Sequence, residues 1–298
     1  MHKIVECVPN FSEGRDAGKI AMIVDAFRGK EGVKLLDYSN DTDHNRMVVT
    51  VIGAPEAVKL AMLEATRTAI SVIDLNGHRG QHPRIGAVDV VPFIPVANMT
   101  MDEAVALSKE VAREMAQRYD LPVYLYEKSA SAPHRENLAA VRKGAFEGLT
   151  EKMKLPEWNP DYGPATPHPT AGAVAVGARN FLIAFNVNLN TTDPAIAEKI
   201  AKKIRFIGGG LRYCKAIGIH LKEKNLVQVS VNLTDPSKTR LYQIVEMIRF
   251  EAARYGVTIA GSELIGLIPL EAVLDTMSYY LGLENLSPAQ VLESHLPM

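Results

Sequence analysis

Hydrophobic residues in the first half of the chain recur with two spacings, one typical of strands and one typical of helices. Alternating or β-branched runs predict strands, and the spacing of Ile20, Ile23, Val24 and Phe27 predicts a helix. The strands predicted in this way are residues 3–9, 33–38, 47–52 and 87–94, and the helices are residues 16–28 and 54–73. The order along the chain is therefore strand, helix, strand, strand, helix, strand.

Additional elements follow this unit. The pattern predicts a helix over residues 101–119, a strand over 123–126 and a further helix from about 136 to 153. From residue 156 to residue 172 the composition changes to five prolines, two glycines and the single tryptophan, without helical spacing. This segment is predicted to be a linker or a binding loop.

The second half repeats the element order of the first. The predicted strands are residues 181–189, 215–221, 226–233 and part of 257–268; the helices are 193–207, 237–255, 269–280 and 287–296; a hairpin turn is expected at 222–225. Two halves with the same order indicate a duplicated ferredoxin-like unit. The predicted fold class is α+β, with two βαββαβ subdomains at residues 1–178 and 179–298.

A loop between a predicted helix and a predicted strand carries the strongest candidate chemistry. Residues 77–89 hold two histidines, two arginines and three glycines. The glycines exclude a helix, and Arg79 stands where a metalloprotease zinc motif has glutamate, which argues against such a site. His82 titrates near neutrality and could accept and return a proton, with arginines holding carboxylates beside it. The alternative is a surface loop in which His82 bonds a neighbouring carbonyl, and the spacing alone does not choose between the two.

Two predicted strands carry rows of uncharged polar side chains. Strict alternation with apolar residues places each row on one face of its strand. The rows are Asn186, Asn188 and Asn190 in one strand and Gln228, Ser230 and Asn232 in the other. Amides and a hydroxyl suit a ligand ring with several N–H and C=O groups. On the pattern alone, a solvated sheet face or a polar seam between the halves is the favoured interpretation.

Composition narrows the class of protein. The 298 residues are 47% hydrophobic, enough for a large core, and a net charge of −1 offers no general attraction for nucleic acid or an anionic membrane. Cys7 and Cys214 lack the spacing of a zinc site or a disulfide framework, so both are expected to be buried thiols. No apolar run has the length of a membrane span or the position of a signal peptide. A cytoplasmic protein is expected.

Five sequence blocks in order give the chain a family resemblance. They are VECVPNFSEG at residues 5–14, HPR at 82–84, VVPFIPV at 90–96, PVYLY at 122–126 and GARNFLIAFN at 177–186. With these blocks the chain, from residue 3 to about residue 285, resembles glutamate formimidoyltransferase, the transferase half of formiminotransferase-cyclodeaminase. The resemblance implies two α/β subdomains with helices outside and sheets facing a central ligand tunnel in which folate lies.

The resemblance also implies an activity and its co-substrate. The family transfers the formimino group between N-formimino-L-glutamate and tetrahydrofolate in histidine catabolism and one-carbon metabolism. Tetrahydrofolate is a co-substrate, and no metal is required. A homodimer is expected. Because the sequence has no deaminase half, a separate cyclodeaminase is expected to release ammonia from the formimino-folate product.

Site residues follow from the same resemblance, position by position. His82 aligns with the catalytic histidine and would act as general acid and base. Arginines that would hold substrate carboxylates are Arg46, Arg79, Arg84 and Arg179. With the family in view, the polar rows favour ligand contact, through Asn186, Asn188, Gln228, Ser230 and Asn232. The folate-binding segment falls on Gly163, Pro164, Ala165, Thr166, Pro167, His168, Pro169, Thr170, Ala171 and Gly172.

Two alternative functions use the same residues differently. One keeps the folate site but starts from 5-formyl-tetrahydrofolate, as a transferase or cycloligase. The other is a non-catalytic tandem ferredoxin-like sensor that binds a small anion. An assay with both folate substrates, on the wild type and a His82 variant, would separate the three.

Overall fold

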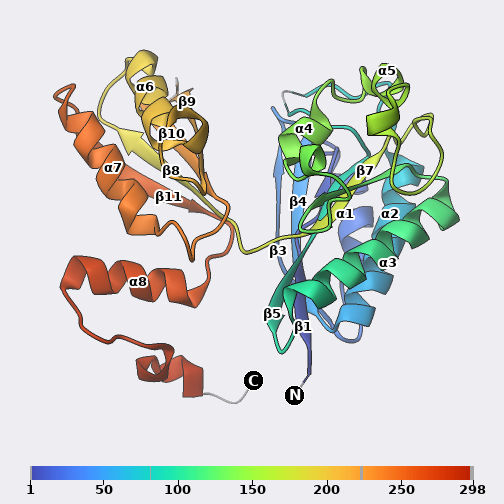
Figure 1. Cartoon of the computed structure of the whole chain (residues 1–298), viewed down its shortest axis with the longest axis horizontal. Coiled ribbons are helices and arrows are strands. Elements are labelled where there is room, and N and C mark those ends of the chain that lie inside the picture. Colours follow the sequence, from blue (N-terminus) through green and yellow to red (C-terminus); the bar gives the residue numbers. More distant parts are fainter. Residues whose placement is uncertain (1, 81, 222–223, 296–298) are drawn as a thin grey trace. The chain divides into compact units, whose positions relative to one another are not determined.

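The computed structural model describes residues 2–80, 82–221 and 224–295, and its contacts divide the chain into two compact units (Figure 1). Unit 1 comprises residues 1–179 and unit 2 comprises residues 180–298. Each unit has its own β-sheet and its own hydrophobic core. Gln81 of the histidine loop and residues 222 and 223 of the predicted hairpin turn lie outside the described residues.

The described residues of unit 1 form one sheet of seven strands. Their bounds are β1 Ile4–Cys7, β2 Asn10–Phe11, β3 Val33–Asp41, β4 Arg46–Gly53, β5 Val88–Ala97, β6 Val123–Glu127 and β7 Val174–Ala178. Strand β4 lies between β3 and the consecutive strands β1 and β2, which both pair with β5 on their other side. These pairings are antiparallel, whereas β7 runs parallel to both β5 and β6.

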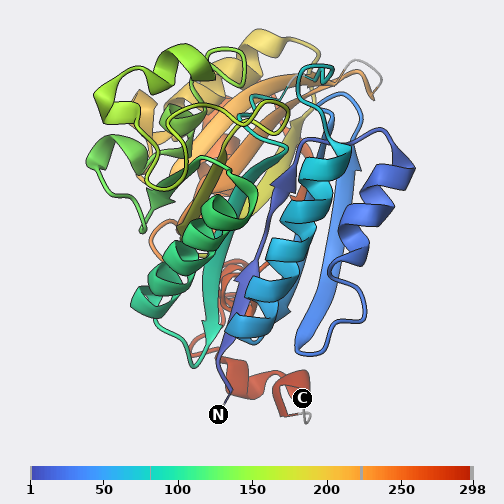
Figure 2. The ribbon, with the colours of Figure 1, turned by 90° about the vertical axis from the view of Figure 1, so that its right-hand side faces the viewer.

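The helices of unit 1 cover both faces of this sheet. They are α1 Ala17–Asp25, α2 Pro55–Val72, α3 Met101–Tyr119, α4 Leu138–Arg142 and α5 Leu149–Met153, with short 3-10 helices η1 Pro133–Arg135 and η2 Pro156–Trp158. The first three pack across one face of the sheet (Figure 2) and share the larger core with it. Alternate strand residues point to the other face, where Val90, Tyr124 and Ala175 pack with α4 and α5.

Local sequence explains where the longer helices begin. Asp16 caps α1 by accepting hydrogen bonds from the backbone N–H groups of Gly18 and Lys19. Pro55 opens α2 with a fixed φ. At α3, Thr100 and Glu103 form a reciprocal capping box.

The structure differs from the predictions for unit 1 in two places. The helix expected from about residue 136 to residue 153 is two short helices, α4 and α5, because the chain turns at residues 143–148, where Gly144 has φ +95°. Strand β7 was not predicted. Its sequence, VAVGA, is short and buried on both faces, so it shows no alternation.

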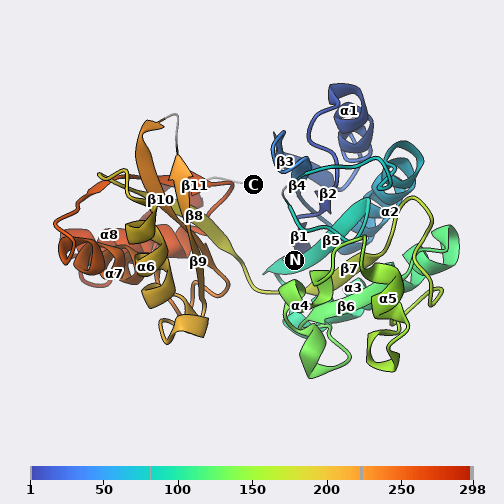
Figure 3. The same ribbon diagram turned by 90° about the horizontal axis from the view of Figure 1, so that it is seen from above.

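Where the structure describes it, unit 2 consists of a four-stranded antiparallel sheet with helices against it (Figure 3). Its elements are β8 Ile183–Leu189, α6 Pro194–Ile204, η3 Phe206–Gly208, β9 Cys214–Leu221, β10 Leu226–Leu233, α7 Leu241–Ala253, β11 Ile259–Ile265, α8 Leu270–Leu281, η5 Pro288–Gln290 and η6 Leu292–His295. The strands lie in the order β11, β8, β10, β9. The predicted order of strands and helices is confirmed from β8 to β11, whereas the helix expected at 287–296 is two 3-10 helices.

Apolar residues of β8 and β10 form the core of unit 2. Phe185, Val187, Val229 and Val231 are buried with residues of α6 and α7, among them Ile200. The intervening polar residues therefore share the opposite face of the sheet. The alternation predicted for these two strands is confirmed.

Candidate active site

The loop that carries His82 connects α2 to β5 and is fixed by backbone hydrogen bonds to a distant segment. Leu75 N–H donates to the Thr170 carbonyl, and Ala87 N–H donates to the Ala171 carbonyl, each at 2.9 Å. The Ile85 carbonyl accepts from the N–H group of Ala173, also at 2.9 Å. The structure thus joins two regions that the sequence singled out separately, the histidine loop and the segment 163–172.

The end of segment 163–172 forms a tight reversal. His168 and Gly172 exchange two backbone hydrogen bonds, of 2.9 and 3.0 Å, and the His168 Nδ1 atom accepts from the Ala171 N–H. Gly172 has φ +69°, and a Cβ there would lie 2.1 Å from the Ile85 carbonyl oxygen, so this close approach requires glycine. His168 and Gly172 therefore shape the segment, while Gly163, Ala165, Thr166 and Pro169 are its exposed members.

His82 lies at the edge of a buried charged cluster. Its Nε2 atom is 3.7 Å from the Asp89 Oδ2 atom, and its side chain is 12% exposed. Pro83 follows directly, which restricts the backbone of His82 to extended conformations. The ring of His44 lies with its centroid 6.3 Å from that of His82.

Asp89, the second residue of β5, is the anion of this cluster. It is 1% exposed. Its Oδ1 atom accepts the backbone N–H of Ile85 at 2.8 Å, and its Oδ2 atom accepts a hydrogen bond from Arg142 Nη2. Burial acts to raise the pKa of Asp89, but the charge of Arg142, the nearby His82 ring and the hydrogen bond from Ile85 outweigh it and lower the pKa. Asp89 is therefore a carboxylate at neutral pH.

Two arginines, Arg46 and Arg142, add positive charge beside His82. Burial lowers the pKa of His82; Asp89 opposes this shift, and both arginines reinforce it. Burial, with the charge of Arg142, also lowers the pKa of Arg46. Among the described residues, His82 Nε2, Arg46 Nε and Arg142 Nε are buried without a hydrogen-bond partner. Buried polar atoms without partners are uncommon in folded proteins, so this cluster has unused capacity to bind a polar ligand.

His78 and Arg84 of the same loop are bonded within unit 1. The His78 Nε2 atom lies 2.9 Å from the Asn45 carbonyl, and its Nδ1 atom accepts from Arg84 Nε at 3.1 Å. Arg84 donates two hydrogen bonds to the carboxylate of Glu147, at 2.8 and 2.7 Å. The predicted carboxylate partner of Arg84 is thus supplied by the chain itself, and both side chains brace the loop.

The remaining predicted arginines lie at different places. Arg79 is exposed and donates to the carbonyls of Asn76 and His78, at 3.1 and 2.8 Å. Arg179 follows β7, and its backbone N–H donates to the Phe93 carbonyl at 3.0 Å. Burial raises the pKa of Glu6, and the charge of Arg179 opposes that shift. Arg46 and Arg142 are the two arginines whose charges act most directly on His82.

The predicted polar residues of unit 2 are neighbours on one face of its sheet. Gln228 lies opposite Asn188, and Ser230 lies opposite Asn186. The Gln228 Nε2 atom donates to the Asn188 Oδ1 atom at 2.9 Å. Asn232 lies further along the same face and is exposed.

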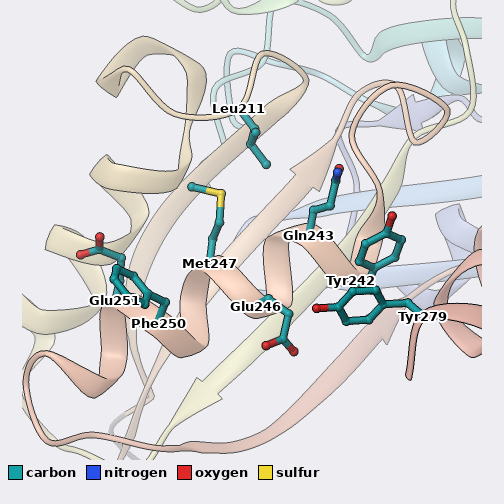
Figure 4. Close-up of a pocket in the computed structure, with 8 residues that line it drawn as sticks. All are labelled: Leu211, Tyr242, Gln243, Glu246, Met247, Phe250, Glu251 and Tyr279. Carbon is teal, nitrogen blue, oxygen red and sulfur yellow. The ribbon is translucent and has the colours of Figure 1, made fainter. Parts of the chain in front are cut away.

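A pocket of about 520 Å³ lies elsewhere in unit 2 (Figure 4). Its lining is Leu211, Tyr242, Gln243, Glu246, Met247, Phe250, Glu251 and Tyr279. Most of these residues belong to α7, which carries none of the predicted site residues. The rings of Tyr242 and Tyr279 stack with centroids 4.2 Å apart.

Sequence reasoning missed two members of the His82 cluster. A carboxylate at the start of a strongly apolar strand, Asp89, was a usable signal, because buried carboxylates are rare unless paired. Arg142 gave no signal, since an arginine in a helical pattern is usually a surface residue. The described residues contain no group of three or more histidine, cysteine, aspartate or glutamate side chains arranged to hold a metal ion. Likewise, no helix within the described part of the chain is long and apolar enough to cross a membrane.

Comparison with known proteins gives the family of this fold and cluster. Residues 4–179 match the N-terminal subdomain of the formiminotransferase domain, and residues 184–295 match the formiminotransferase domain. The chain belongs to the formiminotransferase domain family.

Three relatives define its neighbourhood within the family. Glutamate formimidoyltransferase of Streptococcus pyogenes serotype M1 is 49% identical over 297 residues, which cover 99% of this chain and 99% of that protein. Glutamate formimidoyltransferase of Thermoplasma acidophilum is 44% identical over 97% of this chain and 96% of that protein. Formimidoyltransferase-cyclodeaminase of Rattus norvegicus is 44% identical over 96% of this chain but only 54% of its own length.

Proposed function

We propose that this chain is a glutamate formimidoyltransferase in which His82 is the general acid and base. The observation that carries the proposal is the His82 cluster, whose buried nitrogen atoms have no hydrogen-bond partner among the described residues, on a loop hydrogen-bonded to segment 163–172. Relatives that match nearly the whole chain carry this enzyme name. The substrates would be tetrahydrofolate and N-formimino-L-glutamate.

The reaction needs one group that can move a proton between two nitrogen atoms. N5 of tetrahydrofolate attacks the amidine carbon, forming a C–N bond, and the bond from that carbon to the glutamate nitrogen then breaks. N5 loses one proton and the departing glutamate nitrogen gains one, so the step balances without another reactant. Because burial lowers the pKa of His82, its imidazole is neutral at neutral pH and ready to accept the first proton.

Arg46 is the arginine best suited to a substrate carboxylate. Its Nε atom is buried without a partner among the described residues, and its charge acts on His82. A guanidinium in this state gains charge-assisted hydrogen bonds when a carboxylate arrives. Arg84, by contrast, already holds Glu147. We therefore assign the glutamate carboxylate to Arg46.

The proposal extends to folate and to the fold of each unit. Segment 163–172 would hold folate through its exposed members, since its buried end is used to shape the loop. Each unit would be a ferredoxin-like subdomain; the βαββαβ order from β8 to β11 supports this for unit 2. The amides of Asn186, Asn188 and Gln228 would then face the folate ring. A homodimer and a separate cyclodeaminase complete the proposal.

One assay tests the proposed function. Purified wild type is given tetrahydrofolate with N-formimino-L-glutamate and, separately, 5-formyl-tetrahydrofolate. We expect turnover of the first pair and a loss of about 100-fold or more in His82→Gln, since a general base contributes roughly that factor. His295→Gln, an exposed histidine in η6, is the control and should keep its activity. Turnover of 5-formyl-tetrahydrofolate alone would favour the transferase or cycloligase alternative, and turnover of neither would favour a sensor.

A further inference from the structure

We propose that Asp89 and Arg142 form a buried ion pair that positions the His82 imidazole for proton transfer. The inference rests on the proposed function, because it gives His82 the role of proton carrier. Asp89 and Arg142 are positioning residues in this account, since they act through His82.

Asp89 has a fixed orientation because both of its oxygen atoms are used. Oδ1 is held by the N–H of Ile85, only four residues before Asp89 in the same loop-to-strand turn. Oδ2 is shared between Arg142 Nη2 and the Nε2 side of His82. With the carboxylate held at one end by the backbone, the other end offers a fixed acceptor to the imidazole.

This geometry selects a tautomer of His82. A proton on Nε2 faces the Asp89 carboxylate, whereas a lone pair on Nε2 would be repelled by it, so the proton resides on Nε2 and Nδ1 is the acceptor. The distance of 3.7 Å exceeds a hydrogen bond, and contacts of this kind commonly shorten when the substrate is bound. We therefore assign proton transfer with substrate to Nδ1 of His82.

Arg142 holds the carboxylate from the other side. It is the last residue of α4, and the end of this helix is secured by Lys152, whose Nζ donates to the carbonyls of Ala140 and Val141 at 2.8 and 2.6 Å. The ammonium of Lys152 also bonds the Lys143 carbonyl at 3.3 Å. Arg142 thus reaches Asp89 from a braced helix end.

Three charged residues act on His82, and each belongs to a different strand or helix. Asp89 on β5 is the anion, while Arg142 on α4 and Arg46 on β4 are the cations. His44, in the turn before β4, contributes a nearby ring. Removing Asp89 leaves the two cations unopposed and should lower the pKa of His82, whereas removing Arg142 should raise it.

A simpler role for Asp89 would be to neutralise the buried Arg142. The two roles differ in a double variant. If Asp89 only neutralises Arg142, deleting both charges restores activity, because no buried charge is left without a partner. If Asp89 positions His82, the double variant stays slow, since the imidazole still lacks its acceptor.

The experiment compares Asp89→Asn, Arg142→Gln and the double variant. For each, kcat and KM are measured against pH, and the pKa of His82 is measured by NMR from its ring proton, assigned with His82→Gln. We expect kcat to fall about 100-fold in Asp89→Asn with KM unchanged, a smaller loss in Arg142→Gln, and no recovery in the double variant. The pKa of His82 should fall in the first variant and rise in the second.

The matched control is Asp161→Asn, which removes the carboxylate of the other buried Arg–Asp pair of unit 1. It should leave the pKa of His82 and the pH dependence of kcat unchanged. Recovery of kcat to within about tenfold of wild type in the double variant would overturn the proposal. So would a pKa of His82 that is the same in all variants.

Two features keep the test decisive. Asn at position 89 keeps an acceptor for the Ile85 N–H, and if that variant nevertheless fails to fold, Arg142→Gln decides by the direction in which the pKa of His82 moves. The NMR titration does not depend on turnover. A wild type that transfers no formimino group would therefore end the proposed function, while the titration would still judge the coupling of His82 to the pair.

Discussion

The described part of unit 1 contains two largely buried Arg–Asp pairs, and they differ in how many hydrogen-bond donors of the arginine already have acceptors. In the first, Arg142 donates to Asp89 through Nη2, and its Nε has no partner among the described residues. In the second, Arg135 donates to Asp161 at 2.8 Å and also to the carbonyls of Glu157 and Asn159, both at 2.7 Å. The Arg135 guanidinium also lies over the rings of Tyr124 and Trp158, with its Cζ atom 5.5 Å from the centroid of Tyr124.

The comparison distinguishes the Arg135–Asp161 pair, which stabilises the fold, from the Arg142–Asp89 pair, which belongs to the candidate active site. Burial of an ion pair costs free energy, and the cost is offset only when the remaining donors find acceptors. Around Arg135 the backbone supplies them, so this pair fastens η2 and the following residues to β6. Around Arg142 and Arg46, the part of the chain that the structure describes leaves the two Nε atoms without hydrogen-bond partners, next to an imidazole of lowered pKa. Buried polar atoms without hydrogen-bond partners, beside a group with a shifted pKa, are typical of a ligand-binding site.

The largest expected effect is on folding, at the structural pair. Arg135→Gln leaves Asp161 buried without its cation and two carbonyls without donors, so the free energy of unfolding should fall by about 3–5 kcal/mol. Urea unfolding measures this change. Arg254→Gln, which removes the exposed arginine of a surface pair with the half-buried Glu251, is the control and should cost about 0.5 kcal/mol or less. A loss below about 1 kcal/mol at Arg135 would remove the distinction between the two pairs.

A smaller effect, on binding, is expected at Arg46. Arg46→Gln should raise KM for N-formimino-L-glutamate about 10- to 100-fold, because a charge-assisted hydrogen bond is worth about 1.5–3 kcal/mol. Its stability in urea should be equal to that of wild type or higher, since the substitution removes a buried Nε atom that has no hydrogen-bond partner among the described residues. Steady-state kinetics with Arg28→Gln, an exposed arginine after α1, provides the control. An unchanged KM would show that Arg46 does not receive the carboxylate.

The smallest expected effect is a pH dependence of the free energy of unfolding that comes from Lys152. Burial lowers the pKa of Lys152 from 10.5 to about 8. Below pH 8 the folded and unfolded chains both carry this proton, but between pH 8 and 10.5 the unfolded chain binds more protons, so stability contributed by this group should rise with pH in that window. The rise should be no more than about 1 kcal/mol, because the ammonium is only half-buried.

The single tryptophan makes this prediction measurable. Lys152 Nζ lies 3.7 Å from the centroid of the Trp158 ring, so tryptophan emission should change with a midpoint near pH 8. Lys152→Met should show neither the emission change nor the rise in stability. The enzymatic activity, by contrast, should change with pH below neutrality, because burial lowers the pKa of His82.

Local patterns predicted much of the fold. Strict alternation identified β8 and β10 and their polar face, and helical spacing over residues 54–73 found α2, which spans Pro55–Val72. The patterns failed where burial removes periodicity, as in β7, and where a glycine interrupts a helical spacing, as between α4 and α5. A local pattern reports one exposed and one buried face, so it misses a strand that is buried on both faces. It also does not show where the backbone turns between two helices.

The candidate site depended on contacts that no local pattern contains. The histidine loop and segment 163–172 were both marked by composition, but their pairing through Ala87 and Ala171 is formed only in the folded chain. Arg142 lies 53 positions from Asp89 in the sequence, so their ion pair was not predictable. Arg84 shows the converse: the sequence indicates that it suits a carboxylate, but not that the carboxylate of Glu147 already accepts hydrogen bonds from it.

Both cysteines of the chain are sealed in the cores of their units. Burial raises the pKa of Cys7 well above its usual value, and it raises the pKa of Cys214 to about 12. Neither thiol will compete for an alkylating reagent at neutral pH. A single new cysteine on the surface of each unit would therefore take spin or fluorescent labels selectively in the otherwise native chain, and the separation of the labels would report directly how the two units respond when folate is added.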